Sequence, residues 1–253
     1  MDFALGVRCF AGKGRCGKEE LDKMTGEQAS KREWIAYEAV KERLAFRLIP
    51  QRGNERLLEI AAHIRFLDLA ILFYFTLEAE DRRYAMITIG REQMEAWNME
   101  PEELFQTARR NCRRNMPPEF GLLWEQIAKM TGSRAVPEAI SPIYILSNAD
   151  LFYGAACILY EGVLREIALQ LGSDLLILPS SVHEVLIVPD ESEWEKSELE
   201  WMVRGINREV VAEEDRLSDQ IYRYSLKTGQ LEGIDGQPGV PLDKGQQRSD
   251  EIA

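Results

Sequence analysis

One short segment, Ser180-Ser181-Val182-His183-Glu184, holds the residue types of a hydrolytic site. Along an extended backbone Ser181 and His183 share a face, so a serine nucleophile could meet a histidine base, with a carboxylate supplied from elsewhere. The competing interpretation is a turn between two apolar strands, in which serine side chains hydrogen-bond to their own backbone. No Gly-x-Ser-x-Gly motif is present to expose a nucleophile. We favour the turn, with His183 at a strand end, and keep Ser181, His183 and Glu184 as the catalytic candidates.

The second group is basic. Arg109, Arg110, Arg113 and Arg114 form the one basic cluster, and a spacing of four residues aligns them in two pairs on a helix. Cations at the C-terminal end of a helix are expected from the helix dipole alone. The functional alternative is a docking patch for a phosphate or for an acidic segment. The chain's own C-terminal quarter is such a segment, since residues 190–253 hold 16 acids and 8 bases.

A third candidate is the polar pair Asn148 and Asp150, which precedes the small residues Gly154-Ala155-Ala156. Small residues at the start of a strand let a ligand or another backbone approach closely, and the two polar side chains could contact that ligand. Turn and packing roles explain the same residues equally well.

Cofactor and metal sites are not predicted. The segment from Gly12 to Glu19 has the glycine and lysine spacing of a phosphate-binding P-loop, but Glu19 stands where Ser or Thr must ligate magnesium. We therefore interpret it as a basic leader. Metal ligands are also scarce, because the only histidines are His63 and His183 and the four cysteines have no close spacing.

The balance of 31 Lys and Arg against 43 Asp and Glu leaves a net charge of −12. This charge disfavours nucleic acid and anionic membranes as partners. The longest apolar run, residues 69–77, is far shorter than the roughly 20 residues of a membrane helix. The first residues do not resemble a secretory signal, and the scattered cysteines suggest reduced thiols. We expect a cytoplasmic protein whose partner is an unknown protein or small molecule.

Strand and helix patterns alternate along the chain. Helices are predicted over residues 33–48, 92–97, 101–112, 120–130, 163–171 and 193–210. The last of these is predicted to bury Trp194, Trp201, Met202 and Ile206. Strands are predicted over residues 67–77, 84–89, 143–147, 155–160, 175–178, 184–188 and 221–224. The clustering of strand pairs favours an α+β fold over a parallel α/β sheet. We predict one domain over residues 32–228, with a largely antiparallel sheet of six or seven strands and helices mainly on one face. Residues 1–31 form a poorly ordered, glycine-rich leader in this prediction, and residues 229–253 form a disordered tail.

Three segments, residues 66–75, 153–164 and 178–190, resemble a bacterial family seen mainly in clostridial genomes, the domain of unknown function 5688. The resemblance spans roughly residues 38–231. A fainter likeness, in residues 94–97, 102–105 and 108–111, points to a second uncharacterised bacterial family. Neither family has an established activity, so the resemblance implies a fold and no chemistry. Family members also continue upstream with ordered sequence, and we expect a truncated or displaced start in this chain.

The leading functional hypothesis is a non-enzymatic binding or adaptor protein, because the candidate reactive residues are also explained by turns and caps. Its ligand or partner residues would be Asn148, Asp150 and the four arginines. The alternative is a hydrolase-like enzyme that acts on a small polar substrate near Ser181, His183 and Glu184.

Overall fold

The computed structural model describes residues 7–11, 14–15, 35–78, 83–132, 142–179, 181–190, 194–209 and 211–236. Within these ranges the strands form two six-stranded sheets in which every pair is antiparallel. The α+β class is confirmed, and each sheet has the predicted number of strands. The strands divide between two sheets rather than forming one.

The first sheet has the order β2-β1-β6-β5-β3, and β4 also pairs with β5. Its strands are β1 (Val7–Ala11), β2 (Gly14–Arg15), β3 (Leu44–Pro50), β4 (His63–Phe66), β5 (Leu69–Glu78) and β6 (Arg83–Thr88). The predicted hairpin is confirmed as β5 and β6. Strands β1 and β2 fall within the predicted leader and extend this sheet beyond β6. Most of the P-loop-like segment lies outside the described residues.

The second sheet has the order β12-β11-β9-β10-β8-β7. Its strands are β7 (Pro118–Leu122), β8 (Tyr144–Asn148), β9 (Leu175–Leu178), β10 (Val185–Pro189), β11 (Tyr222–Tyr224) and β12 (Leu231–Gly233). In β9, Leu175 and Ile177 join the core between the sheets, whereas Leu176 and Leu178 join a second cluster on the opposite face. This strand is continuously apolar because both of its faces are covered.

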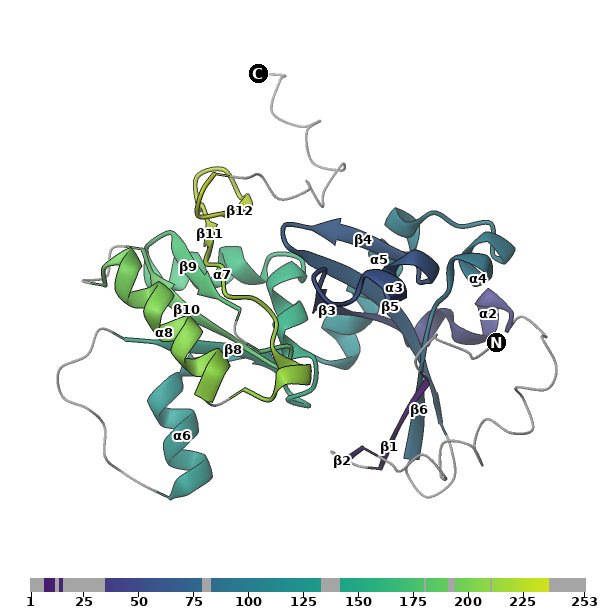
Figure 1. Cartoon of the computed structure of the whole chain (residues 1–253), viewed down its shortest axis with the longest axis horizontal. Coiled ribbons are helices and arrows are strands. Elements are labelled where there is room, and N and C mark those ends of the chain that lie inside the picture. The colour runs from purple at the N-terminus through teal and green to yellow at the C-terminus, as the bar shows by residue number, and fades with distance from the viewer. Residues whose placement is uncertain are drawn as a thin grey trace.

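Helices cover the sheets and connect them (Figure 1). The α-helices are α2 (Tyr37–Val40), α3 (Glu55–Ile60), α4 (Arg91–Ala96), α5 (Pro101–Asn115), α6 (Leu123–Thr131), α7 (Val163–Leu171) and α8 (Lys196–Glu209), and the 3₁₀ helices are η1 (Lys41–Arg43), η3 (Gly154–Leu159) and η4 (Glu213–Asp215). Side chains of α5, η3 and α7 enter the core between the sheets, while α8 packs on the outer face of the second sheet. None of the helices in the described ranges combines the length and the apolar character needed to cross a membrane.

Helix α5 holds the arginine cluster and begins where its sequence predicts. Pro101 occupies the first turn, and Glu100 and Glu103 form a reciprocal capping box that satisfies free backbone N–H groups. Its apolar side packs on β3, with the rings of Phe105 and Phe46 5.2 Å apart. The Asn111 side-chain amide donates to the Leu44 carbonyl oxygen at 3.0 Å. These contacts fix the rotation of α5, so the arginines lie on a defined side.

A buried polar contact joins the two sheets. The Tyr222 hydroxyl on β11 donates to Asp68 Oδ1 at 2.5 Å, and the Ser218 hydroxyl donates to Asp68 Oδ2 at 2.7 Å. Asp68 lies in the turn between β4 and β5, in which Leu67 has a φ of 52°. Burial, reinforced by the Asp68 carboxylate, raises the pKa of Tyr222 above its usual range.

Four local predictions were wrong. The predicted helix over residues 120–130 begins only at Leu123, because residues 118–122 form strand β7. The predicted helix over residues 33–48 gives way to strand β3 at Leu44, and the predicted strand over residues 155–160 is the 3₁₀ helix η3. Both segments are apolar and buried, and a short buried run does not distinguish strand from helix. Trp201 is 78% exposed rather than buried, because α8 faces its sheet through Leu199 and Val203.

Candidate functional site

The turn between β9 and β10 presents Ser181, His183 and Glu184 together. The His183 backbone N–H donates to Ser181 Oγ at 3.0 Å, which is the local serine turn expected from the sequence. The Ser181 hydroxyl is hydrogen-bonded to the Glu184 carboxyl group. Ser181 is only 3% exposed and forms an isolated bridge with Arg216. Its hydroxyl therefore serves the turn. Ser180 lies outside the described residues.

Both nitrogens of the His183 ring are engaged. The Tyr153 backbone N–H donates to Nδ1 at 3.3 Å, and Nε2 lies 3.4 Å from Asp215 Oδ1. A ring nitrogen that accepts a hydrogen bond carries no proton, so the neutral ring has its proton on Nε2, facing Asp215. Neither nitrogen bonds to the Ser181 hydroxyl. This geometry does not supply the base that a serine nucleophile requires.

Aromatic rings enclose this imidazole on the protein side. The Tyr153 ring stacks on it at 5.7 Å with an interplanar angle of 11°, and the Phe152 ring lies at 5.8 Å. The Tyr153 hydroxyl accepts from the buried Arg47 guanidinium at 2.6 Å. We call Tyr153, Ser181, His183, Glu184 and Asp215 the His183 site. Burial raises the pKa of Glu184, opposed by the hydrogen bond from Ser181 and by the nearby imidazole.

The loop before η3 is held against this site. The Asn148 side chain donates to the Phe152 carbonyl oxygen at 2.8 Å and accepts from the Phe152 N–H at 3.1 Å, so its amide is used within the loop. Leu151 and Tyr153 have φ values of 52° and 51°, a region that residues other than glycine rarely adopt. Asp150 is exposed on the same loop. The structure thus brings Asn148 near the predicted catalytic candidates, as a residue that shapes the loop.

Two members of the His183 site were missed by sequence reasoning. Asp215 lies 32 positions after His183, and nothing in its acidic surroundings marks it as a partner for the imidazole. Asp174, an acidic residue just before β9, pairs with Arg223 at 2.9 Å and not with His183. A signal for Tyr153 existed in its partner Arg47, a charged residue between Phe46 and Leu48 in an apolar segment. A buried charge requires a polar partner, and the Tyr153 hydroxyl is that partner.

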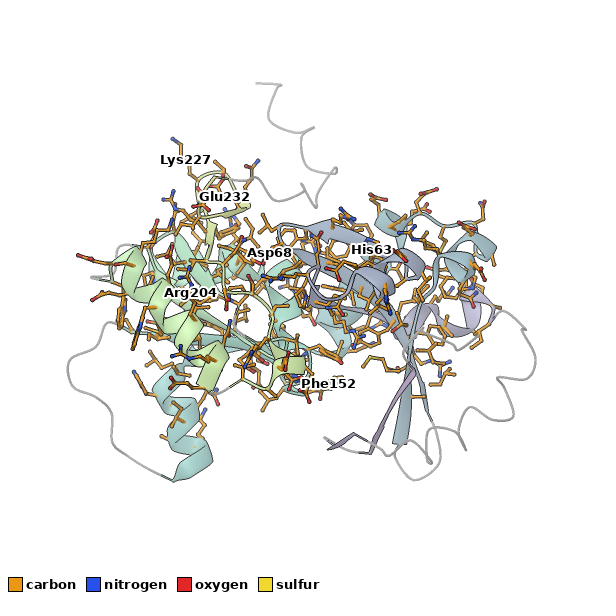
Figure 2. All side chains as sticks on the ribbon, in the orientation of Figure 1. His63, Asp68, Phe152, Arg204, Lys227 and Glu232 are labelled. Atoms are coloured by element: carbon orange, nitrogen blue, oxygen red, sulfur yellow. The ribbon has the colours of Figure 1, made fainter. Side chains whose placement is uncertain are left out.

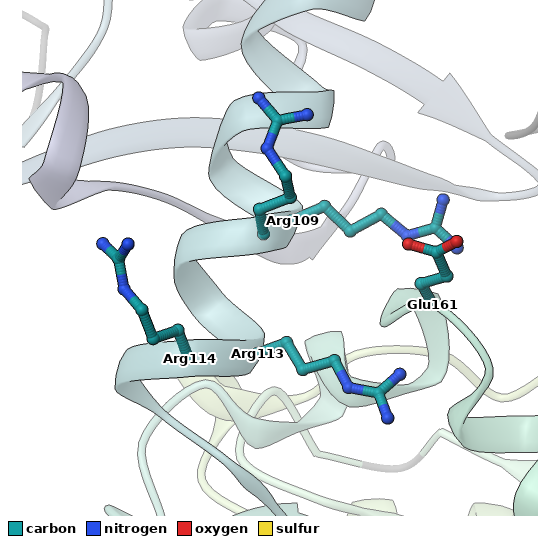
Figure 3. A pocket seen from close by; sticks show the side chains of 5 residues that line it. Arg109, Arg113, Arg114 and Glu161 are labelled. Carbon is teal, nitrogen blue, oxygen red and sulfur yellow. The ribbon is translucent and has the colours of Figure 1, made fainter.

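The four arginines line a second site, a hollow of about 290 Å³ together with Glu161 (Figure 3). We call these five residues the arginine hollow. It lies between α5 and the turn that precedes α7. Arg109 is 8% exposed, and its guanidinium lies 5.8 Å from the centre of the Phe105 ring. Arg110 and Arg114 are exposed. The predicted alignment of the arginines thus forms one concave surface.

Two of these arginines also form ion pairs. Arg113 Nη2 lies 3.0 Å from Glu166 Oε1 on α7, and Arg114 Nη2 lies 2.7 Å from Glu42 Oε2 on η1. All four side chains in these pairs are at least 40% exposed. Exposed ion pairs contribute only about 0–1 kcal/mol, so a stronger anion can displace the glutamates at small cost. The hollow therefore offers guanidinium groups to a ligand.

The described residues contain no group of three or more His, Cys, Asp or Glu side chains positioned to hold a metal ion. His63 lies apart from His183, on the edge strand β4, where its Nδ1 lies 3.0 Å from the Ala61 carbonyl oxygen. Figure 2 shows His63 on the first sheet and Phe152 beneath the junction of the two sheets.

The fold and the two sites define a two-sheet α+β protein in which the predicted base His183 bonds to Tyr153 and Asp215 rather than to the Ser181 hydroxyl. Residues 18–226 match a family described only as a family of unknown function, DUF5688, and the chain belongs to that family. Comparison with curated proteins and comparison with solved structures gave no match.

Proposed function

We propose that this protein is a non-enzymatic binding or adaptor module whose arginine hollow takes an anionic group of its ligand. One observation carries the proposal: four guanidinium groups from one helix line a single hollow in a protein whose net charge is −12. Planar guanidinium groups donate paired hydrogen bonds to phosphate and carboxylate oxygens, and a group of them favours phosphate.

The His183 site supports a binding role over the hydrolase alternative. The His183 imidazole accepts a hydrogen bond from the Tyr153 N–H and faces the Asp215 carboxylate, and the Ser181 hydroxyl accepts a hydrogen bond within the turn. A cytoplasmic location is part of the same proposal, because Cys112 and Cys157 are free thiols.

The test is calorimetric titration of the protein with inorganic phosphate. The variant Arg110→Gln/Arg113→Gln removes two charges from the hollow. Binding should weaken about tenfold or more, because each hydrogen bond to a charged group is worth about 1.5–3 kcal/mol.

The matched control is Arg204→Gln/Arg208→Gln, which removes two exposed arginines from α8 that also have glutamate neighbours. The control should bind phosphate as the wild type does. Equal losses in the two variants, or no binding of phosphate by the wild type at millimolar concentration, would refute the proposal.

A further inference from the structure

Glu161 is the one acidic residue in the lining of the arginine hollow. It is exposed, and Figure 3 shows its carboxylate directed toward the arginine side chains. Glu42 and Glu166 are ion-paired with arginines of the same cluster, whereas no hydrogen bond or ion pair engages Glu161 among the residues that the structure describes. An ionised carboxylate can only accept hydrogen bonds. The lining thus combines several cationic donors with one anionic acceptor.

We infer that the ligand of the arginine hollow is a monosaccharide phosphate, with its phosphate group on the arginines and its hydroxyl groups donating to Glu161. The inference rests on the proposed function and names its ligand class. A purely anionic ligand would be repelled by the Glu161 carboxylate, so that residue would only weaken the site. A ligand that also carries hydrogen-bond donors turns the same carboxylate into a favourable contact.

The charges of the lining select hydroxyl groups as those donors. Four arginines and one glutamate line the hollow, and Glu166 and Glu42, which lie outside the lining, pair with Arg113 and Arg114. An ammonium group would gain from Glu161 but would be repelled by the guanidinium groups around it, whereas a neutral hydroxyl donates to the carboxylate without that repulsion.

The size of the hollow fits one small molecule. Its volume of about 290 Å³ lies just below the range of about 300–1,000 Å³ that small-ligand pockets span. A phosphorylated monosaccharide matches this size better than a nucleotide with both base and sugar. The rigid core contacts of α5 keep the arginines on this side of the helix before a ligand arrives.

The experiment titrates the full chain with inorganic phosphate, glucose 6-phosphate, ribose 5-phosphate and unphosphorylated glucose. The wild type should bind at least one of the two sugar phosphates about tenfold more tightly than inorganic phosphate, which corresponds to one added hydrogen bond to a charged acceptor. Glucose alone should bind too weakly to measure. In Glu161→Ala the advantage of the sugar phosphate should disappear, while inorganic phosphate should bind as tightly as before or more tightly.

The variant Glu166→Gln is the matched control, since it removes a carboxylate that contacts Arg113 and does not line the hollow. It should keep the preference for the sugar phosphate. If inorganic phosphate binds but neither sugar phosphate binds more tightly, the inference is wrong and the proposed function stands. The inference is also wrong if Glu161→Ala keeps the full preference. If no phosphate compound binds, both the inference and the proposed function fail.

Discussion

Gly154 lies where three backbone segments converge, and Gly154→Ala should destabilise the protein strongly. A Cβ atom at this position would stand 2.2 Å from Ser147 Oγ, 2.5 Å from the His183 carbonyl oxygen and 2.7 Å from the Asn148 nitrogen. Two of these atoms belong to the backbone, so rotation of a side chain cannot relieve the overlap. Strand β8 or the turn at His183 must move away from η3.

The expected loss of stability in Gly154→Ala has two contributions. Forcing an extra methyl group into a filled site costs about 1–3 kcal/mol. The displacement would also disturb the hydrogen bond from the Ser147 hydroxyl to the His183 carbonyl oxygen, which is 2.8 Å long and worth about 0.5–1.5 kcal/mol. We therefore expect a loss of about 3 kcal/mol in the free energy of unfolding. For a chain of this size each kcal/mol lowers the melting temperature by about 2–4 °C, so the midpoint should fall by roughly 6–12 °C.

The assay is urea denaturation followed by far-ultraviolet circular dichroism, with Gly205→Ala as the matched control. Gly205 lies inside α8, and a Cβ atom there would meet nothing within 4 Å. Alanine is the better helix former by about 0.5–1 kcal/mol, so this variant should be more stable than the wild type. If Gly154→Ala unfolds within 0.5 kcal/mol of the wild type, on the order of a surface substitution, the close approach of η3 to the turn is wrong.

Three further outcomes are expected. Asp68→Ala leaves the buried Tyr222 hydroxyl without its acceptor and should lower the free energy of unfolding by about 2–3 kcal/mol. The same substitution in a Tyr222→Phe background should lower it by less. Equal losses in this double-mutant cycle would contradict the contact between the sheets. Because the folded protein raises the pKa of Glu184 above its ordinary value of 4.5, this group's contribution to stability is present below that pH and is lost as the pH rises through the folded pKa. Glu184→Gln should therefore stabilise the protein at pH 7 relative to the wild type, and the gain should vanish below about pH 4.5; a gain that does not change with pH would argue against a raised pKa. Burial raises the pKa of both Cys112 and Cys157 to about 12. In a variant that lacks the other two cysteines, a thiol reagent at pH 8 should therefore label neither residue until the protein unfolds. Rapid labelling of the native protein would contradict their burial.

Local patterns in the sequence were enough to predict several elements. The capping box and Pro101 mark the start of α5, and Gly132 and Gly172 end α6 and α7 with φ values of 70° and 71°. The alternating residues of β5 and the return through β6 predict their hairpin. Each of these features depends on residues close together in the chain, whose hydrogen bonds and periodicity are set by the residues themselves.

Buried segments were harder to predict, because their conformation depends on what covers them. The spacing of Val40, Leu44 and Leu48 fits a helix, yet Leu44 begins strand β3 because β5 offers a partner edge and α5 covers one face. In α8 the exposure of Trp201 follows from the rotation of the helix on its sheet, which Leu199 and Val203 decide. An apolar residue in the sequence does not reveal which neighbour will bury it.

The sequence alone determined the α+β class, the alignment of the arginines on one helix and the serine turn before His183. Only the tertiary structure decided that Asp215 and Tyr153 occupy the two nitrogens of the imidazole, and that Glu161 completes a hollow with the arginines. The reason is physical. A helix face or a turn arises from neighbouring residues. The His183 site joins the loop before η3, the turn between β9 and β10, and η4, whereas the arginine hollow joins α5 and the turn before α7. Both sites exist only after the core between the two sheets has packed and has fixed these elements relative to one another.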